Sequence, residues 1–91
     1  MPTISWFYGI AIRMYVVDHN PPHFHVIYNE YAAMISISNG ELIEGSLPKR
    51  ARRLVADWME LHHAELVANW ALASEGNQPE RIAGLDADQG D

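Results

Sequence analysis

The spacing of the apolar residues changes once along this chain, and the change divides the chain into two halves. Up to about residue 45, apolar and polar side chains alternate, which is typical of β-strands that bury one face. Beyond that point the apolar residues recur three and four positions apart, as they do on a buried helix face. Strands followed by helices predict an α+β fold, with an antiparallel sheet of four to five strands covered on one face by two C-terminal helices.

Five segments of the first half have the β-branched and aromatic content of strands. They are residues 3–8, 10–17, 23–29, 31–38 and the short segment 41–44. Gly9 and the pair Asn39-Gly40 are suited to the tight turns that join neighbouring strands. Pro21 and Pro22 lack amide donors and restrict the residues before them, so they predict a loop between the second and third strands.

Two helices are predicted in the second half. Ser46 is suited to cap the first helix, whose initial turn accommodates Pro48. The buried stripe restarts in a different phase after the adjacent histidines His62 and His63, so we expect a break there and a second helix over residues 64–74. Adjacent residues diverge by about 100° around a helix, so these two histidines are interpreted as a helix joint and not as a metal-binding pair.

The length of 91 residues fits one domain, which we predict to span residues 1–76. Residues 77–91 are small, polar and acidic, and they are predicted to form a disordered tail. No stretch approaches the roughly 20 apolar residues of a membrane-spanning helix, and we see no secretory leader. We therefore expect a cytoplasmic protein with no membrane partner.

The amino-acid composition limits the kinds of metal site and of binding partner that this chain can have. The chain has no cysteine, which excludes disulfides, thiolate zinc sites and iron–sulfur clusters, so metal ligands must come from histidine, aspartate and glutamate. Its formal net charge of -6 argues against a broad attraction to nucleic-acid phosphates.

The densest group of reactive side chains lies in the segment Asp18-His19-Asn20-Pro21-Pro22-His23-Phe24-His25. On a strand, His23 and His25 project from the same face, and the diproline loop can bring Asp18 or His19 beside them. Imidazole and carboxylate suit zinc, nickel or iron. Asp18, His19, His23 and His25 are therefore candidate ligands of a divalent metal, zinc or nickel, and the three histidines are candidate catalytic acids and bases. The alternative is that these residues serve a turn and a surface or interface strand.

Lys49, Arg50, Arg52 and Arg53 form a basic run at the start of the first predicted helix. Cations oppose the helix dipole at that end, so an anion is expected nearby. Glu41 and Glu44 can supply it, which makes the run a solvated helix face. The functional alternative is that the run binds nucleic-acid phosphates or another anion.

The segments Met1-Pro2-Thr3-Ile4, Asp18 to Val26 and Ala68-Asn69-Trp70 together resemble the bacterial family known as domain of unknown function 4160. The resemblance runs from about residue 1 to residue 75. His19, Asn20, Pro21, Pro22, His23 and His25 match its signature, whereas the basic run departs from its more mixed charge. The resemblance implies a short stand-alone protein, often encoded beside another small protein in a toxin–antitoxin-like pair. It implies no catalytic residue.

Three functional hypotheses follow. The first is a binding module that pairs with a small protein encoded nearby, or with itself, through the sheet face or edge. The second is a hydrolase, most directly a ribonuclease, in which the three histidines act directly or through a metal and the arginines of the basic run hold phosphate. The third is a DNA-binding regulator, although the segment from Leu61 to Ala64 offers no clear turn between the helices. The sequence does not decide whether the protein is an enzyme or a non-catalytic protein.

Overall fold

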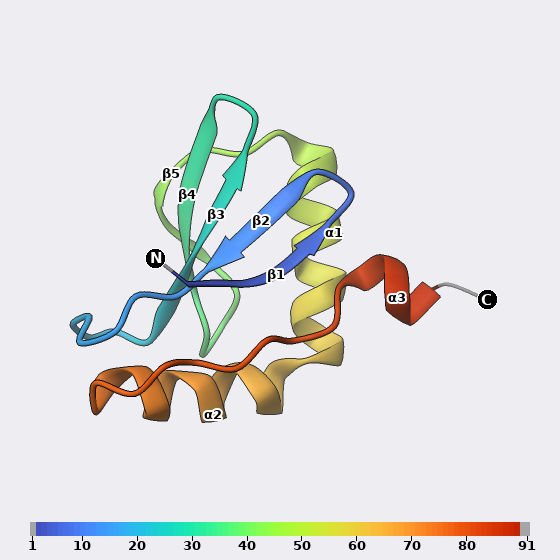
Figure 1. The fold of residues 1–91 in the computed structure, drawn as a ribbon. Coiled ribbons are helices and arrows are strands. Elements are labelled where there is room, and N and C mark those ends of the chain that lie inside the picture. The colour runs from blue at the N-terminus through green and yellow to red at the C-terminus, as the bar shows by residue number, and fades with distance from the viewer. Residues whose placement is uncertain (1, 90–91) are drawn as a thin grey trace.

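The computed structural model of this chain describes residues 2–89. Five strands form one antiparallel sheet in the order β1-β2-β3-β4-β5, so each strand pairs with the next one in sequence (Figure 1). The α+β prediction is confirmed. The elements are β1 (Thr3–Phe7), β2 (Ile10–Arg13), β3 (His23–Tyr28), β4 (Tyr31–Ser36), β5 (Leu42–Gly45), α1 (Lys49–Leu61), α2 (His63–Ser74) and α3 (Leu85–Gln89).

The alternation of side chains decides which face of the sheet meets the helices. Ile12 of β2 lies opposite Val26 of β3, and both are fully buried on the helix side. Because neighbours along a strand point to opposite faces, Arg13 and its cross-strand partner His25 lie on the other side. We call that side, which α1 does not cover and which α2 meets only at one end of the sheet, the open face.

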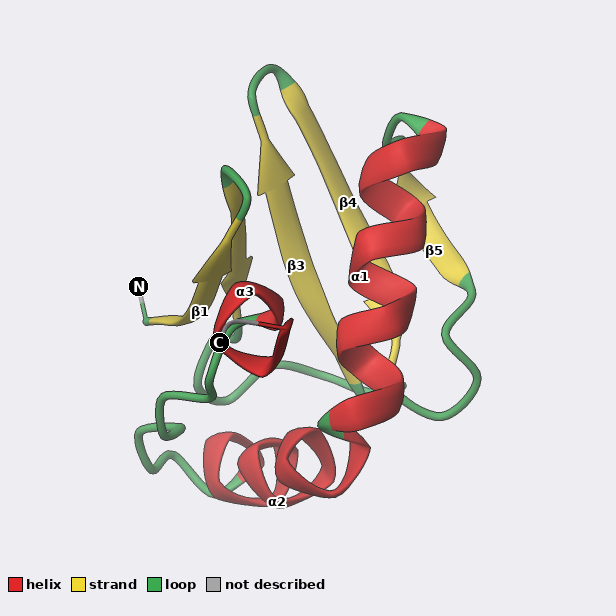
Figure 2. Ribbon diagram, turned by 90° about the vertical axis from the view of Figure 1, so that its right-hand side faces the viewer, coloured by secondary structure: helices red, strands yellow, loops and turns green. Residues whose placement is uncertain are grey.

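The helices close the core from one side of the sheet. Helix α1 lies over one face of the sheet, and α2 lies at one end of it and runs in a different direction from α1 (Figure 2). Trp58 of α1 and Leu66 of α2 belong to the same buried cluster as the inward side chains of the strands. The two helices are joined through His62 alone.

Three local expectations need correction. Strand β2 ends at Arg13 and not at residue 17, because Val17 adopts a positive φ of 56° that reverses the chain. Helix α1 begins at Lys49 after an extended Pro48, and no side chain caps it, so Ser46 lies too early to do so. Strand β5 is shifted by one residue and ends at Gly45. A Cβ atom at that glycine would lie 2.1 Å from the carbonyl oxygen of Ala32.

The predicted disordered tail is also a correction for the part that the structure describes. Residues 77–89 run back along α2 towards α1 and end in α3 (Figure 1). Ile82 and Leu85 are buried, and the Ile82 backbone N–H donates to the carbonyl oxygen of Ile4 at 2.7 Å. Two apolar residues among small polar ones suffice to dock the segment, and the folded unit extends past residue 76. Gly90 and Asp91 lie outside the described residues.

None of the helices within residues 2–89 has both the length and the apolar content to cross a membrane.

Candidate metal centre

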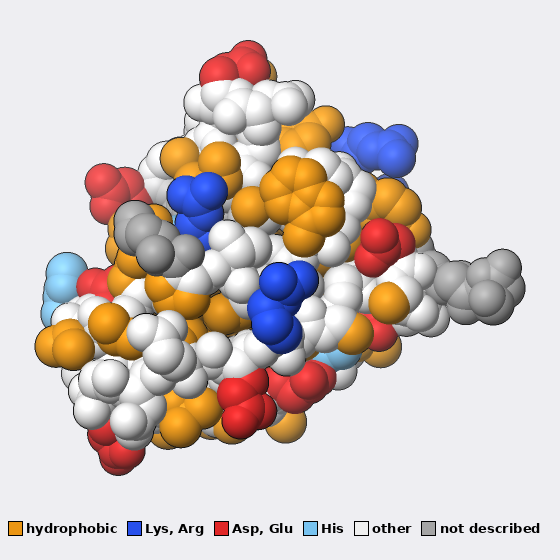
Figure 3. Space-filling model, viewed as in Figure 1, with side chains coloured by type: hydrophobic (Ala, Val, Ile, Leu, Met, Phe, Trp, Pro, Cys, Tyr) orange, Lys and Arg blue, Asp and Glu red, His pale blue; other side chains and the backbone are white. Residues whose placement is uncertain are grey.

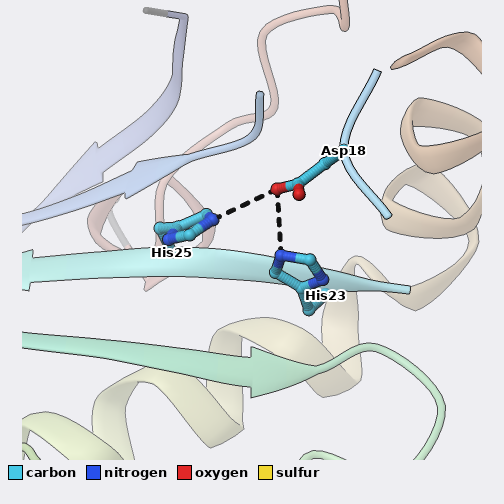
Figure 4. Close-up of side chains that lie close together, drawn as sticks. All are labelled: Asp18, His23 and His25. Atoms are coloured by element: carbon cyan, nitrogen blue, oxygen red, sulfur yellow. Dashed lines mark hydrogen bonds and ion pairs between the residues drawn. The ribbon is translucent and has the colours of Figure 1, made fainter. Parts of the chain in front are cut away.

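The outward side chains at the start of β3 form one wall of the candidate site. His23 and His25 project from the same face of this strand, since they are two residues apart, whereas Phe24 between them enters the core. Figure 4 shows both imidazoles directed at the carboxylate of Asp18, which hangs over the strand from the preceding loop.

The loop returns over the sheet because of Val17. A positive φ is rare for a β-branched residue, and it costs about 1–2 kcal/mol. The backbone N–H of Val17 donates to the carbonyl oxygen of Ala73 in α2 at 2.7 Å, which ties the reversal to the helix layer. Backbone strain of this kind gathers at functional sites, and here it sets the position of Asp18.

Three side-chain atoms converge on one point. Oδ2 of Asp18 lies 3.0 Å from Nε2 of His23 and 3.4 Å from Nε2 of His25. All three ligand atoms lie within 4.8 Å of one another. Ligands of a tetrahedral zinc ion, bonded at about 2.0–2.1 Å, are separated by about 3.3 Å, so small side-chain adjustments admit one ion.

The orientation of the His23 ring makes Nε2 the atom that is directed at this point. Its Nδ1 lies 2.7 Å from the carbonyl oxygen of Pro21, and a carbonyl only accepts, so Nδ1 carries a proton. Nε2 therefore faces the Asp18 carboxylate either with a second proton or with its lone pair. The first form makes a hydrogen bond to Asp18, and the second is the form that binds a metal ion. An Nδ1–H bond to a backbone carbonyl is also the usual way in which proteins orient a histidine that binds metal through Nε2.

The electrostatic surroundings favour the metal-binding protonation states. Burial by itself raises the pKa of Asp18, but the His19 backbone N–H and the adjacent imidazoles outweigh it and hold that pKa below its ordinary value. Burial lowers the pKa of His25, and the hydrogen bond to Asp18 offsets this only in part. A carboxylate and a neutral imidazole are the forms that bind metal, and the two lowered pKa values favour these forms at Asp18 and His25.

Aromatic neighbours hold the two rings in place. The Tyr15 ring meets His25 edge-on at 4.4 Å between centroids, and Trp70 of α2 packs against His23 at 5.3 Å. His23 is buried, and His25 is partly exposed. Beside His25, a shallow hollow of about 230 Å³ on the open face is lined by residues that include Ile27, Met34 and Glu44.

His19 lies at the rim of the site. Its Nδ1 is 3.2 Å from Oδ1 of Asp18, the oxygen that does not face the other two histidines, and its side chain is 89% exposed. His19 therefore contacts Asp18 from the solvent side, away from the point where the other ligand atoms meet.

The basic run does not belong to this cluster. Lys49, Arg50, Arg52 and Arg53 occupy the first turn and a half of α1, the end of that helix that lies away from α2 (Figure 2). His23, by contrast, contacts α2 through Trp70, so roughly 20 Å of helix separates the two regions. Among the described residues no ion pair joins the basic run to Glu41 or Glu44.

Two neighbours of the site, Tyr15 and Arg13, escaped the sequence analysis. Both share the face of His25, and Arg13 lies directly opposite it in the neighbouring strand. Alternation along residues 10–17 places Arg13 and Tyr15 on one side together. Their proximity to the histidines depends on the register of β2 and β3, which no single segment encodes.

The fold and the site define a small α+β protein that carries two histidines and one aspartate around a single point on the open face of its sheet. This chain belongs to the family described as "Domain of unknown function (DUF4160)", which matches residues 9–71. The match contains the whole of Asp18 to Val26 and ends within α2, while Met1 to Ile4 lie outside it. No curated protein and no solved structure matches the chain.

Proposed function

We propose that this protein binds one divalent transition-metal ion, zinc or nickel, through Asp18, His23 and His25, and that it acts as a metal-dependent hydrolase. The observation that carries the proposal is the convergence of three ligand atoms on one point, with the His23 ring locked so that Nε2 faces it. Three protein ligands leave a coordination position open, which is typical of catalytic and not of structural sites.

The chemistry that such an ion supplies when bound is polarisation of a substrate oxygen and activation of water for attack on it. Around it, this chain's own residues have separate tasks. Asp18 and the two imidazoles bind, Pro21 and Trp70 orient the His23 ring, and exposed His19 is placed to exchange protons with solvent beside Asp18. This combination suits hydrolysis, including the cleavage of RNA.

Calorimetric titration with zinc and with nickel tests the metal site. The wild type should bind one equivalent, and Asp18→Asn and His25→Ala should each weaken binding by at least about 100-fold, because each removes one of three ligands. His63→Ala is the matched control, since His63 is exposed and, within residues 2–89, its side chain hydrogen-bonds to the carbonyl oxygen of Ile37 and not to the candidate ligands. Equal binding by wild type and His25→Ala would contradict the proposal.

Cleavage of labelled RNA tests the hydrolase step separately. The metal-loaded wild type should cleave, and Asp18→Asn should not, while both keep the same far-ultraviolet circular dichroism. Cleavage that survives both Asp18→Asn and His25→Ala would remove this cluster from the reaction.

A second candidate function, a binding module in a two-gene, toxin–antitoxin-like pair in the cytoplasm, is favoured by one feature of the surface. Trp6 of the edge strand β1 is 57% exposed, and hydrophobic side chains lie over the β1–β2 hairpin (Figure 3). A large aromatic side chain that is exposed on the surface is suited to contact another chain. The proposed partner is the small protein encoded nearby.

Size-exclusion chromatography with light scattering tests this second function. The chain co-expressed with its neighbour should elute as a complex that Trp6→Ser weakens, whereas His63→Ala should leave it intact. A homodimer that Trp6→Ser dissociates would identify a second copy as the occupant, and a monomer under both conditions would reject the module.

No observation favours the DNA-binding regulator. The single residue His62 joins α1 and α2, which is shorter than the three- to four-residue turn of a helix-turn-helix motif.

A further inference from the structure

Arg13 is a cationic residue on the strand next to the candidate metal centre. It is the last residue of β2 and lies opposite His25 of β3. Directly opposed side chains in an antiparallel pair have Cβ atoms about 4.5–5.5 Å apart and share one face. Arg13 therefore flanks His25 on one side, and the hollow lined by Ile27 and Met34 flanks it on the other.

No acidic side chain neutralises Arg13 within the described residues. Its Nε atom is buried and has no hydrogen-bond partner. The Asp18 oxygens are already engaged, Oδ1 by the backbone and ring of His19 and Oδ2 by His23 and His25. Glu44 lies on the same row of the sheet but beyond His25 and Met34, three strands from Arg13, or about 14 Å at the usual strand spacing.

Buried polar groups normally have partners, so the unpartnered Nε of Arg13, on the residue opposite His25, points to a ligand that supplies an acceptor. The charges indicate which kind. A divalent ion with one carboxylate and two neutral imidazoles has a net charge of about +1, and Arg13 raises the total to about +2. The guanidinium fork matches two oxygens of a phosphate group.

We propose that Arg13 is the anion-binding residue of this site and that the substrate carries a phosphate group, one oxygen of which faces the metal position while others accept hydrogen bonds from Arg13. The inference rests on the proposed metal-binding function. The hollow beside His25 then holds the organic part of the phosphate ester against Ile27 and Met34. Phosphate binding, which the sequence suggested for the basic run, is thus assigned to Arg13 of β2.

Calorimetric titration of inorganic phosphate into the zinc-loaded protein tests the inference, after the zinc affinity of each variant has been measured. Arg13→Gln should keep zinc affinity within about threefold, because Arg13 is not a ligand, and should weaken phosphate binding by at least about tenfold. Arg13→Lys keeps the charge but loses the fork, so it should give an intermediate loss. Arg50→Gln, in the basic run, is the matched control and should bind phosphate like the wild type.

The outcomes separate this inference from the proposed function. Zinc binding with unchanged phosphate affinity in both Arg13 variants, or a loss in Arg50→Gln instead, overturns the anion site and leaves the metal site standing. A wild type that binds no metal overturns the proposed function, and the inference with it. Acetate titrated in place of phosphate should bind at least about tenfold more weakly, and equal affinity would reject the phosphate assignment. Melting curves of Arg13→Gln and Arg13→Lys establish that each variant is folded.

Discussion

His23 connects the candidate site to the hydrophobic core. It is only 1% exposed, packs against Trp70 and donates from Nδ1 to the carbonyl oxygen of Pro21, whereas His25 is partly exposed and sits under Tyr15. The two histidines therefore offer the same ligand atom from different environments. His23 serves both the fold and the site, and His25 serves mainly the site.

We expect His23→Ala to lower the free energy of unfolding by about 2–4 kcal/mol, since it leaves a cavity and removes a buried hydrogen bond. His25→Ala should lower it by less than about 1 kcal/mol, although both variants lose the metal. Urea denaturation of the metal-free proteins measures the difference. Equal losses would show that His23 is not the structural member of the pair.

Val17 is the residue whose backbone departs most from its ordinary preference. It is 73% exposed and adopts a φ of 56° next to Asp18. Glycine accepts this conformation without strain. Val17→Gly should therefore be neutral or stabilising by up to about 1 kcal/mol, against the usual sign for such a change. Val67→Gly, exposed inside α2, is the control and should destabilise by up to about 1 kcal/mol. A clear loss of stability in Val17→Gly would contradict the interpretation that the backbone of Val17 is strained.

At the scale of elements, the segment after α2 behaves as part of the fold. Asn69 of α2 donates through Nδ2 to the carbonyl oxygen of Glu80 at 2.8 Å and accepts the Glu80 backbone N–H at 2.9 Å. Trp58 of α1 donates from its indole N–H to the carbonyl oxygen of Ala83 at 2.8 Å. Buried groups on both helices thus depend on this segment for their hydrogen bonds.

Asn69→Ala should lower the free energy of unfolding by about 1–3 kcal/mol, because it removes the two hydrogen bonds that join the buried Asn69 side chain to the backbone of Glu80. Ser74→Ala, which removes an exposed hydrogen bond to Ala71 on the same helix, should cost less than about 0.5 kcal/mol. Thermal and urea denaturation compare the two. Limited proteolysis should cut Asn69→Ala between residues 76 and 84 faster than the control, and equal resistance would argue against the docking.

At the scale of the whole molecule, one ionisable cluster ties the C-terminal end to the helix joint. The His62 ring faces Glu65 through Nδ1, and its Nε2 lies 2.8 Å from Oδ2 of Asp88 in α3. Burial by itself lowers the pKa of His62, but the hydrogen bonds to Glu65 and Asp88 outweigh it and raise that pKa above its ordinary value. A raised pKa in the folded state means that protonation stabilises the fold.

The contribution of His62 to stability should therefore be fully present below pH 6.5, its ordinary pKa, and should be lost as pH rises through the raised value. We expect an effect of up to about 1 kcal/mol, as for partly exposed ion pairs. It is measured as the difference in unfolding free energy between wild type and His62→Gln, which cancels the opposite pH dependence of His25. A difference that grows from pH 6 to pH 9 would contradict the assignment.

The order of residue types along the chain is enough to locate the individual elements. Alternation and helical spacing located all five strands, both long helices and their break at His62, because side-chain direction repeats within each element. The same rule put His23 and His25 on one face of β3. The hairpin predicted at Asn39-Gly40 is confirmed by the antiparallel pairing of β4 and β5, and Gly40 in the connection adopts a positive φ of 75°.

Only the tertiary structure decided which distant residues meet. The return of Asp18 over β3, the register that sets Arg13 against His25, and the burial of Ile82 and Leu85 all join segments that are separate in the chain. Each depends on an interaction between elements. The position of Asp18 depends on the hydrogen bond from Val17 to a carbonyl oxygen of α2, and that of Arg13 depends on the pairing of β2 with β3. The burial of Ile82 and Leu85 depends on the hydrophobic core that they join. The periodicity of apolar residues describes one element at a time. It therefore identified the candidate metal ligands but could not predict that their side chains lie close together.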